Sequence, residues 1–191
     1  MIDRHSAGLL PPKPHTVLRD PSGNVLYEEM HTRRGFDGPF TYFYHRYPVT
    51  PHTEVAMSHR GFPTPVAEEG GRFPIRRRLY QSDKIAAGGQ LLDRRTPVLF
   101  NSELAVYFAR ASESDDAYFA NGDADELWFV HEGGGRLESP CGWLEVKAGD
   151  YVWVPKAMIH RWHLGASGLR AMIFEATGGV RIPEQFRNPV G

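Results

Sequence analysis

The sequence lacks the features of a membrane protein and of a disulfide-stabilised secreted domain. Cysteine occurs once, at Cys141, so no intrachain disulfide can form, which is typical of a reducing compartment. No apolar stretch approaches the roughly 20 residues that a membrane-spanning helix needs, and the first residues do not form the apolar segment of a secretory signal. We therefore expect a cytoplasmic protein without a membrane partner.

An excess of charge of one sign is also missing. The 22 basic and 23 acidic side chains leave a net charge of −1, so no global charge attracts nucleic acid. The densest basic spot is Arg76-Arg77-Arg78, but no aromatic side chains alternate with these arginines to stack on bases. We interpret it as a solvated or interface-pairing strand and expect no nucleic-acid partner.

Residues 1–74 are rich in proline and glycine and show weak apolar periodicity. Prolines interrupt any long helix or central strand there, although the composition of residues 25–28 and 40–44 favours two short strands. A segment of this length seldom stays separate from a compact domain. We expect an irregular N-terminal segment that wraps the following domain or contacts a neighbouring subunit.

Residues 75–191 predict an all-β domain. Short strand-like runs recur between turn residues, a pattern typical of a sandwich or barrel. Gly133-Gly134-Gly135 is interpreted as a hairpin turn between two of the runs. Trp128, Trp143, Trp153 and Trp162 are expected to fill the core. The expected strands are 75–80, 97–100, 104–110, 126–131, 135–138, 143–146, 151–154, 159–164 and 169–175.

The last third contains a spaced motif of turn and strand residues. Gly149 is followed after five residues by Pro155, then by Ala157 and, two residues further, by His160. This spacing resembles the second motif of the cupin superfamily, a jelly-roll β-barrel in which the histidine binds a metal. Ala157 stands where that family usually has glycine. The fold that we expect is therefore a cupin-type jelly roll over residues 75–191.

The first cupin motif is less complete. Glu126 lies seven residues before Gly133, as the ligand carboxylate of the family does, but the positions of the two preceding histidines hold Phe119 and Asn121. A two-histidine, one-carboxylate iron site needs three strong protein ligands. Only Glu126 and His160 match, so we interpret them as a vestigial metal pair, hydrogen-bonded to each other or to solvent. No catalytic or cofactor-binding residue is assigned.

An ordered series of segments resembles homogentisate dioxygenases, with a run Asn-x-Asp-x-Asp-Glu before an apolar stretch and His-x-Gly as its most specific part. The other segments are single short matches that occur in the family's order. The series consists of Lys13-Pro14-His15-Thr16 with Arg19, Tyr44-His45-Arg46, residues 96–101, residues 121–133, Gly149-Asp150-Tyr151 with Val154-Pro155, and Ile182-Pro183 before Phe186-Arg187-Asn188.

The resemblance implies an Fe(II)-dependent, extradiol-type dioxygenase that converts homogentisate and O2 to maleylacetoacetate in aromatic amino-acid catabolism. Members of that family are about twice as long as this chain, and their iron ligands, two histidines and a glutamate, belong to the second barrel. The resemblance therefore implies an iron site outside these residues, with none bound by this chain alone. It also implies a small aromatic acid as substrate and assembly into trimers or hexamers.

Three hypotheses follow from the sequence. The first makes the chain the N-terminal half of such a dioxygenase, and it predicts that the reading frame continues beyond Gly191. The second is a stand-alone, metal-free cupin that acts as a binding or structural module. The third is a small metalloenzyme that uses Glu126, His160 and an unrecognised ligand.

Overall fold

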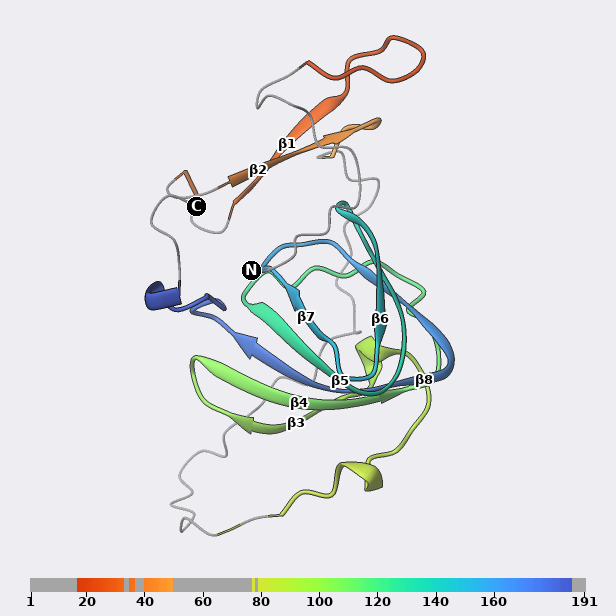
Figure 1. The fold of residues 1–191 in the computed structure, drawn as a ribbon, viewed down its shortest axis with the longest axis vertical. Helices are drawn as coiled ribbons and strands as arrows, with labels where there is room; N and C mark the ends of the chain where they lie inside the picture. The colour runs from red at the N-terminus through yellow and green to blue at the C-terminus, as the bar shows by residue number, and fades with distance from the viewer. Residues whose placement is uncertain (1–16, 33–34, 37–39, 50–76, 78, 187–191) are drawn as a thin grey trace. The chain divides into compact units, whose positions relative to one another are not determined.

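A computed structural model describes residues 17–32, 35–36, 40–49, 77 and 79–186, and their regular structure is almost entirely β-strand (Figure 1). This confirms the predicted all-β class. The chain divides into two compact units, one with the first two strands and one with the remaining six. Each unit is described by itself.

Several sequence-based predictions lie outside the described residues. They include the domain boundary between residues 74 and 75, most of the arginine triplet, and the segments Lys13–Thr16 and Arg187-Asn188. Of the strand expected at 75–80, the described residues Arg77, Leu79 and Tyr80 belong to no strand.

The first unit contains an antiparallel hairpin. Strand β1 (Tyr27–Thr32) pairs with β2 (Phe40–His45). Before β1, the Asp20 carboxylate accepts the backbone N–H groups of Ser22 and Asn24, which closes the turn that the sequence Pro-Ser-Gly-Asn indicates. The strand expected at 40–44 corresponds to β2, whereas β1 begins two residues later than the strand expected at 25–28 and runs on to Thr32.

The second unit is one rolled antiparallel sheet. Its strands are arranged in the order β3-β4-β8-β5-β6, with β7 paired to β5, so the C-terminal strand β8 lies between β4 and β5. This crossover gives a jelly-roll arrangement, and the two ends of the path leave the sheet open. The strands are β3 (Arg95–Phe100), β4 (Leu104–Ala111), β5 (Asp125–Ser139), β6 (Gly142–Lys147), β7 (Tyr151–Val154) and β8 (Arg161–Ala176).

The three-glycine segment is not a hairpin turn, as the sequence suggested. Strand β5 continues through Gly133, Gly134 and Gly135, and β8 likewise joins two runs that were expected to be separate strands. Their pairing shifts register at the glycines. A Cβ on Gly133 would collide with the carbonyl oxygen of Gly168. The glycines therefore allow two long strands to approach closely where they bend.

Two of the four tryptophans form the centre of the core, as expected. Trp128 and Trp162 are fully buried, and their ring centroids lie 5.0 Å apart. The expectation was wrong for Trp143 and Trp153, which are 49% and 46% exposed. Side chains alternate between the two faces of a strand, and Trp153 lies between the buried Val152 and Val154, so its indole points outward.

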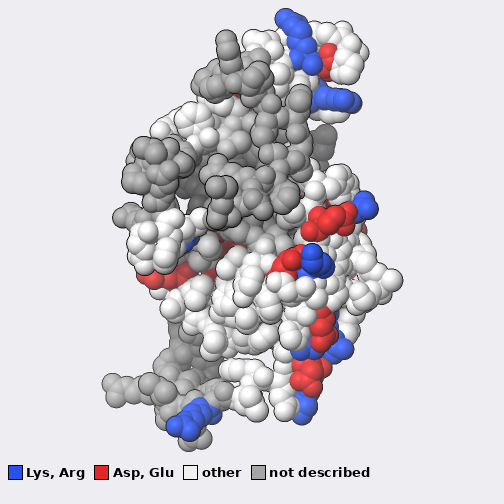
Figure 2. Space-filling model, viewed as in Figure 1, with Lys and Arg blue, Asp and Glu red and all other residues white. Residues whose placement is uncertain are grey.

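Short 3-10 turns are the only helical elements of the described residues: η1 (Ser82–Lys84), η2 (Leu91–Asp93) and η3 (Glu184–Phe186). None of the helices in this part of the chain is long and apolar enough to span a bilayer. On the face shown in Figure 2, the basic and acidic side chains of the described residues lie interspersed.

Candidate functional site

Glu126, at the start of β5, is the central acceptor of a buried polar cluster. Its side chain points into the roll and is fully buried. Arg95 Nη1 donates to Oε1 at 2.7 Å, and Arg95 Nη2 donates to Oε2 at 3.1 Å. Asn121 Nδ2 also donates to Oε1, and Trp128 Nε1 donates to Oε2, each at 3.0 Å. Both carboxylate oxygens are therefore occupied by protein donors.

Arg95 supplies the cation of this cluster. It is the first residue of β3 and is 3% exposed. Its guanidinium carbon lies 4.7 Å from the centre of the Trp128 ring and 5.6 Å from that of Phe119. The positive charge is therefore stabilised by two aromatic rings in addition to the Glu126 carboxylate. A buried charge is tolerated where it is paired and hydrogen-bonded, and both conditions are met here.

The charge of Arg95 decides the ionisation of Glu126. Burial alone would raise the pKa of Glu126, but the Arg95 charge and the hydrogen bonds from Arg95 and Asn121 outweigh it, and the pKa lies below its ordinary value. Glu126 is therefore a carboxylate held by a guanidinium.

Asn121 connects the cluster to a second carboxyl group. Its Nδ2 donates to Glu126 and, at 3.1 Å, to Oε2 of Glu175 on β8. Its Oδ1 accepts the backbone N–H groups of Asp123 and Ala124, both at 3.0 Å. The amide thus fixes the loop before β5 while it bridges two carboxyl groups, one hydrogen to each.

The pKa of Glu175 is shifted in the opposite direction to that of Glu126. It is half-buried and lies opposite Glu126 in the β5–β8 register. Burial, followed by the negative charge of Glu126, raises the pKa of Glu175. Burial and the Glu175 charge also raise the pKa of Tyr107 on β4. The cluster therefore combines one firmly ionised carboxylate with one that holds its proton more tightly.

His160 lies at the same centre and is 2% exposed. Its backbone forms an isolated bridge with Phe119, whose ring meets the imidazole edge-on at 5.7 Å. Because the Met158 carbonyl oxygen can only accept, the His160 Nδ1 atom, 2.9 Å away, carries the proton. Burial lowers the pKa of His160, so the imidazole is neutral.

Glu126 and His160 both lie in the buried interior of the roll, and the Phe119 ring lies against Arg95, the partner of Glu126, as well as against His160. The protein partners of the two side chains are other groups: Glu126 bonds to Arg95, Asn121 and Trp128, and His160 to Met158. The interpretation of the two as a vestigial metal pair stays a prediction. His163 points to the other face, as the alternation of a strand predicts, and contacts Glu138 at 2.7 Å.

These residues do not fit an Fe(II) site. Such a site needs three strong ligands with open positions, whereas both oxygens of Glu126 are held by donors. No group of three or more His, Cys, Asp or Glu side chains that could hold a metal ion is present among the residues that the structure describes.

Sequence reasoning missed Arg95 and Glu175. An arginine at the first position of a strand carries no motif, and Glu175 was placed only as the last residue of a strand-like run. One available signal was chemical. A glutamate predicted to face a barrel interior without its metal requires another cation, and that requirement pointed to a buried arginine or lysine.

Comparison with known proteins shows a relative that aligns with the whole chain. No family model matches. A protein of Saccharolobus solfataricus named "Putative dioxygenase SSO1533" is 28% identical over 193 aligned residues, which cover 100% of this chain and 48% of the relative. The chain therefore spans about half the length of that relative.

Solved structures resemble parts of the fold. A Klebsiella pneumoniae protein with a double-stranded β-helix domain is 18% identical, with a TM-score of 0.46, over 54% of this chain and 92% of its own. A cupin-2 domain protein of Shewanella frigidimarina is 17% identical, with a TM-score of 0.38, over 43% and 78%. The chain is thus a jelly roll by its own strand order, and it is similar in sequence to half of a protein named as a dioxygenase.

Proposed function

We propose that this chain is the non-catalytic, N-terminal part of a ring-cleaving dioxygenase that resembles homogentisate dioxygenase. In this proposal the Fe(II) site, the small aromatic acid substrate and O2 belong to a second half outside these 191 residues. The observation that carries the proposal is the two-point contact between Arg95 and Glu126. A guanidinium occupies both oxygens of the one carboxylate that matches a cupin ligand position.

Two further observations support the proposal. The relative named as a dioxygenase aligns with the whole of this chain but with only 48% of its own length, which leaves room for a second domain in such proteins. The paired, aromatic-flanked cluster is also suited to a rigid structural role, because each of its buried charges is compensated within the protein. We further propose a cytoplasmic homo-oligomer, a trimer or hexamer, as the resemblance implies.

The alternative is a stand-alone, metal-free cupin that serves as a binding or structural module. The buried Arg95–Glu126 pair is equally compatible with this alternative, which requires no second barrel. The two proposals differ in the coding sequence that they require downstream of Gly191. A reading frame that continues into a second barrel with two histidines and a glutamate at ligand positions supports the first proposal, and a stop codon after Gly191 supports the second.

Oxygen consumption tests the catalytic assignment directly. The purified 191-residue chain, supplied anaerobically with Fe(II) and then mixed with homogentisate and O2, is expected to consume no oxygen above a protein-free control. Full activity in the protein that contains both halves, if the frame continues, would complete the test. Iron-dependent ring cleavage by the 191-residue chain alone would overturn the proposal.

A further inference from the structure

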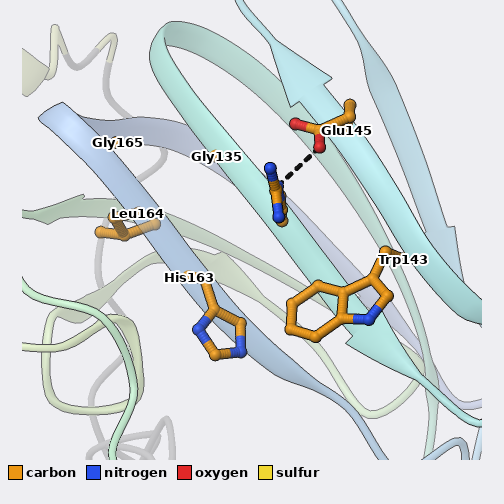
Figure 3. Close-up of a pocket in the computed structure, with 7 residues that line it drawn as sticks. Gly135, Trp143, Glu145, His163, Leu164 and Gly165 are labelled. Atoms are coloured by element: carbon orange, nitrogen blue, oxygen red, sulfur yellow. Dashed lines mark ion pairs between the residues drawn. The ribbon is translucent and has the colours of Figure 1, made fainter.

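A pocket of about 380 Å³ lies on the outer face of the sheet, where β5, β6 and β8 meet (Figure 3). Its side chains alternate with inward-facing ones: Arg136 precedes the buried Leu137, and His163 follows the buried Trp162. It is therefore distinct from the buried cluster inside the roll. Its lining consists of Gly135, Arg136, Trp143, Glu145, His163, Leu164 and Gly165.

Trp143 provides the one large aromatic surface of this pocket. Trp143 is 49% exposed. The centroid of its indole ring lies 4.9 Å from that of the His163 imidazole, and the two ring planes are tilted by 51°. Figure 3 shows the two rings side by side at the edge of the hollow. Gly135 and Gly165 also line the pocket, and a Cβ on Gly135 would collide with the backbone of His163, so this glycine lets β5 and β8 approach closely beneath the pocket.

A hydrogen-bond network behind the pocket fixes His163. Its Nε2 atom lies 2.7 Å from Oε2 of Glu138, which also accepts from Arg161 Nη2 at 2.8 Å, while Oε1 accepts from the Tyr118 hydroxyl at 2.8 Å. The hydrogen bonds from His163 and Tyr118, with the help of Arg161, lower the pKa of Glu138 to about 2. The carboxylate is therefore ionised and holds the imidazole that supports Trp143.

The charges that line the pocket are balanced. Arg136 Nε lies 2.6 Å from Oε1 of Glu145, and the guanidinium carbon lies 5.9 Å from the centre of the Trp143 ring (Figure 3). Both side chains of this pair are exposed, at 58% and 73%. The pocket thus presents donors and acceptors next to one another, beside an aromatic face, without net charge from this pair.

We propose that this pocket binds a neutral carbohydrate. The apolar face of a pyranose ring would lie against the Trp143 indole, and adjacent hydroxyl groups would accept hydrogen bonds from Arg136 and donate them to Glu145. A volume of about 380 Å³ falls in the range of small-ligand sites, and it accommodates one or two sugar rings.

The charge balance favours a neutral ligand over the other ligand classes. An anion would have to separate Arg136 from Glu145 and would leave the carboxylate beside a like charge. A cation would separate the same pair in the opposite sense. A purely apolar ligand would remove water from both charged groups without replacing their hydrogen bonds. A neutral ligand rich in hydroxyl groups can bond to both members of the ion pair without separating them and can cover the aromatic face as well.

The test uses the full 191-residue chain on an array of neutral and sialylated oligosaccharides. Saturation-transfer NMR and fluorescence titration with maltotriose, cellotriose and mannotriose, up to about 10 mM, measure the affinity of the neutral probes. We expect binding of at least one neutral glycan. Trp143→Ala should weaken it about tenfold or more, because the stacked ring is lost. Trp153→Ala is the matched control, since Trp153 is similarly exposed but lies outside the pocket.

Each other outcome overturns the proposal. Absence of binding to every neutral glycan removes the ligand class, and binding of sialylated glycans alone contradicts the charge argument. Equal loss in Trp143→Ala and Trp153→Ala, with unchanged circular dichroism, contradicts the location. A mass that doubles with protein concentration and reverts in Trp143→Ala, without glycan binding, identifies the surface as an interface between copies. None of these results depends on the dioxygenase proposal.

Discussion

Arg95 and Glu126 face each other in a two-point contact, with Nη1 to Oε1 at 2.7 Å and Nη2 to Oε2 at 3.1 Å, and each side chain is 1% exposed. Bidentate contacts between guanidinium and carboxylate are among the stronger charge-assisted hydrogen bonds. The cation that neutralises the buried Glu126 is thus a side chain of the same protein. Arg95 is anchored by the backbone of β3, and its guanidinium is held by Glu126 on β5.

Replacement of Arg95 by methionine should strongly destabilise the fold, because it leaves Glu126 as an unpaired buried charge. We expect a loss of about 3–5 kcal/mol in the free energy of unfolding, measured by urea denaturation at neutral pH. Arg136→Met, which breaks an exposed ion pair, is the control and should cost less than about 1 kcal/mol. Adding Glu126→Gln to Arg95→Met should recover part of the loss. Similar effects of the two single substitutions would contradict the structural role of the buried pair.

Stability should depend on pH through His160. Burial lowers the pKa of His160 below its ordinary value of 6.5, so the unfolded chain binds more protons than the folded one below that pH. The stabilisation is therefore complete above about 6.5 and is lost as the pH falls, by at most about 1.4 kcal/mol per pH unit. His160→Asn, whose amide can still donate to Met158, should flatten the slope between about pH 7 and 5.

His131→Asn is the matched control for that measurement. The His131 side chain is 51% exposed, so its removal should leave the slope as in the natural protein. An unchanged slope in His160→Asn would show that this imidazole is not held neutral by burial.

Ala157→Gly should stabilise the protein. Ala157 has a φ of +64° and is the one non-glycine residue with positive φ among those that the structure describes. The left-handed conformation costs a residue with a Cβ about 1–2 kcal/mol, of which the greater freedom of glycine in the unfolded chain offsets part. We expect a net gain of about 0.5–1 kcal/mol in thermal or urea unfolding. Ala148→Gly, at an exposed turn position without positive φ, should give no gain.

Gly133→Ala should destabilise the sheet where β5 and β8 bend. The added Cβ would meet the carbonyl oxygen of Gly168, and the φ of +75° disfavours a side chain independently. We expect a loss of about 1–3 kcal/mol. Gly178→Ala provides the comparison, because nothing lies within 4 Å of the new Cβ and its φ is not positive. If both variants unfold at the same denaturant concentration, the close approach of the two strands is not as described.

The sequence was sufficient to predict the class of fold and much of the strand content, because alternation and turn residues are local signals. It was misleading at Gly133–Gly135, since glycines mark both turns and close strand contacts, and only the pairing with β8 distinguishes them. The same limit applies to Trp143 and Trp153. Their outward orientation depends on the register of their strands relative to the core.

The candidate site was predictable only in part. Motif spacing brought Glu126 and His160 together, because it reflects the path of consecutive strands. Arg95 lies 31 positions before Glu126, and its contact depends on how β3 pairs with β4 and β4 with β8. No local pattern encodes such a contact. The glycine position of the cupin motif has a clear physical explanation in the positive φ of Ala157.

Iron stoichiometry tests most directly whether an arginine takes the place of a metal inside this jelly roll. The chain is equilibrated anaerobically with Fe(II), freed of excess metal, and measured by elemental analysis beside His160→Ala and Glu126→Gln. If the Arg95–Glu126 pair occupies the site, we expect far less than one iron per chain, and the same iron content in all three proteins. One iron per chain that is lost in both variants would contradict it.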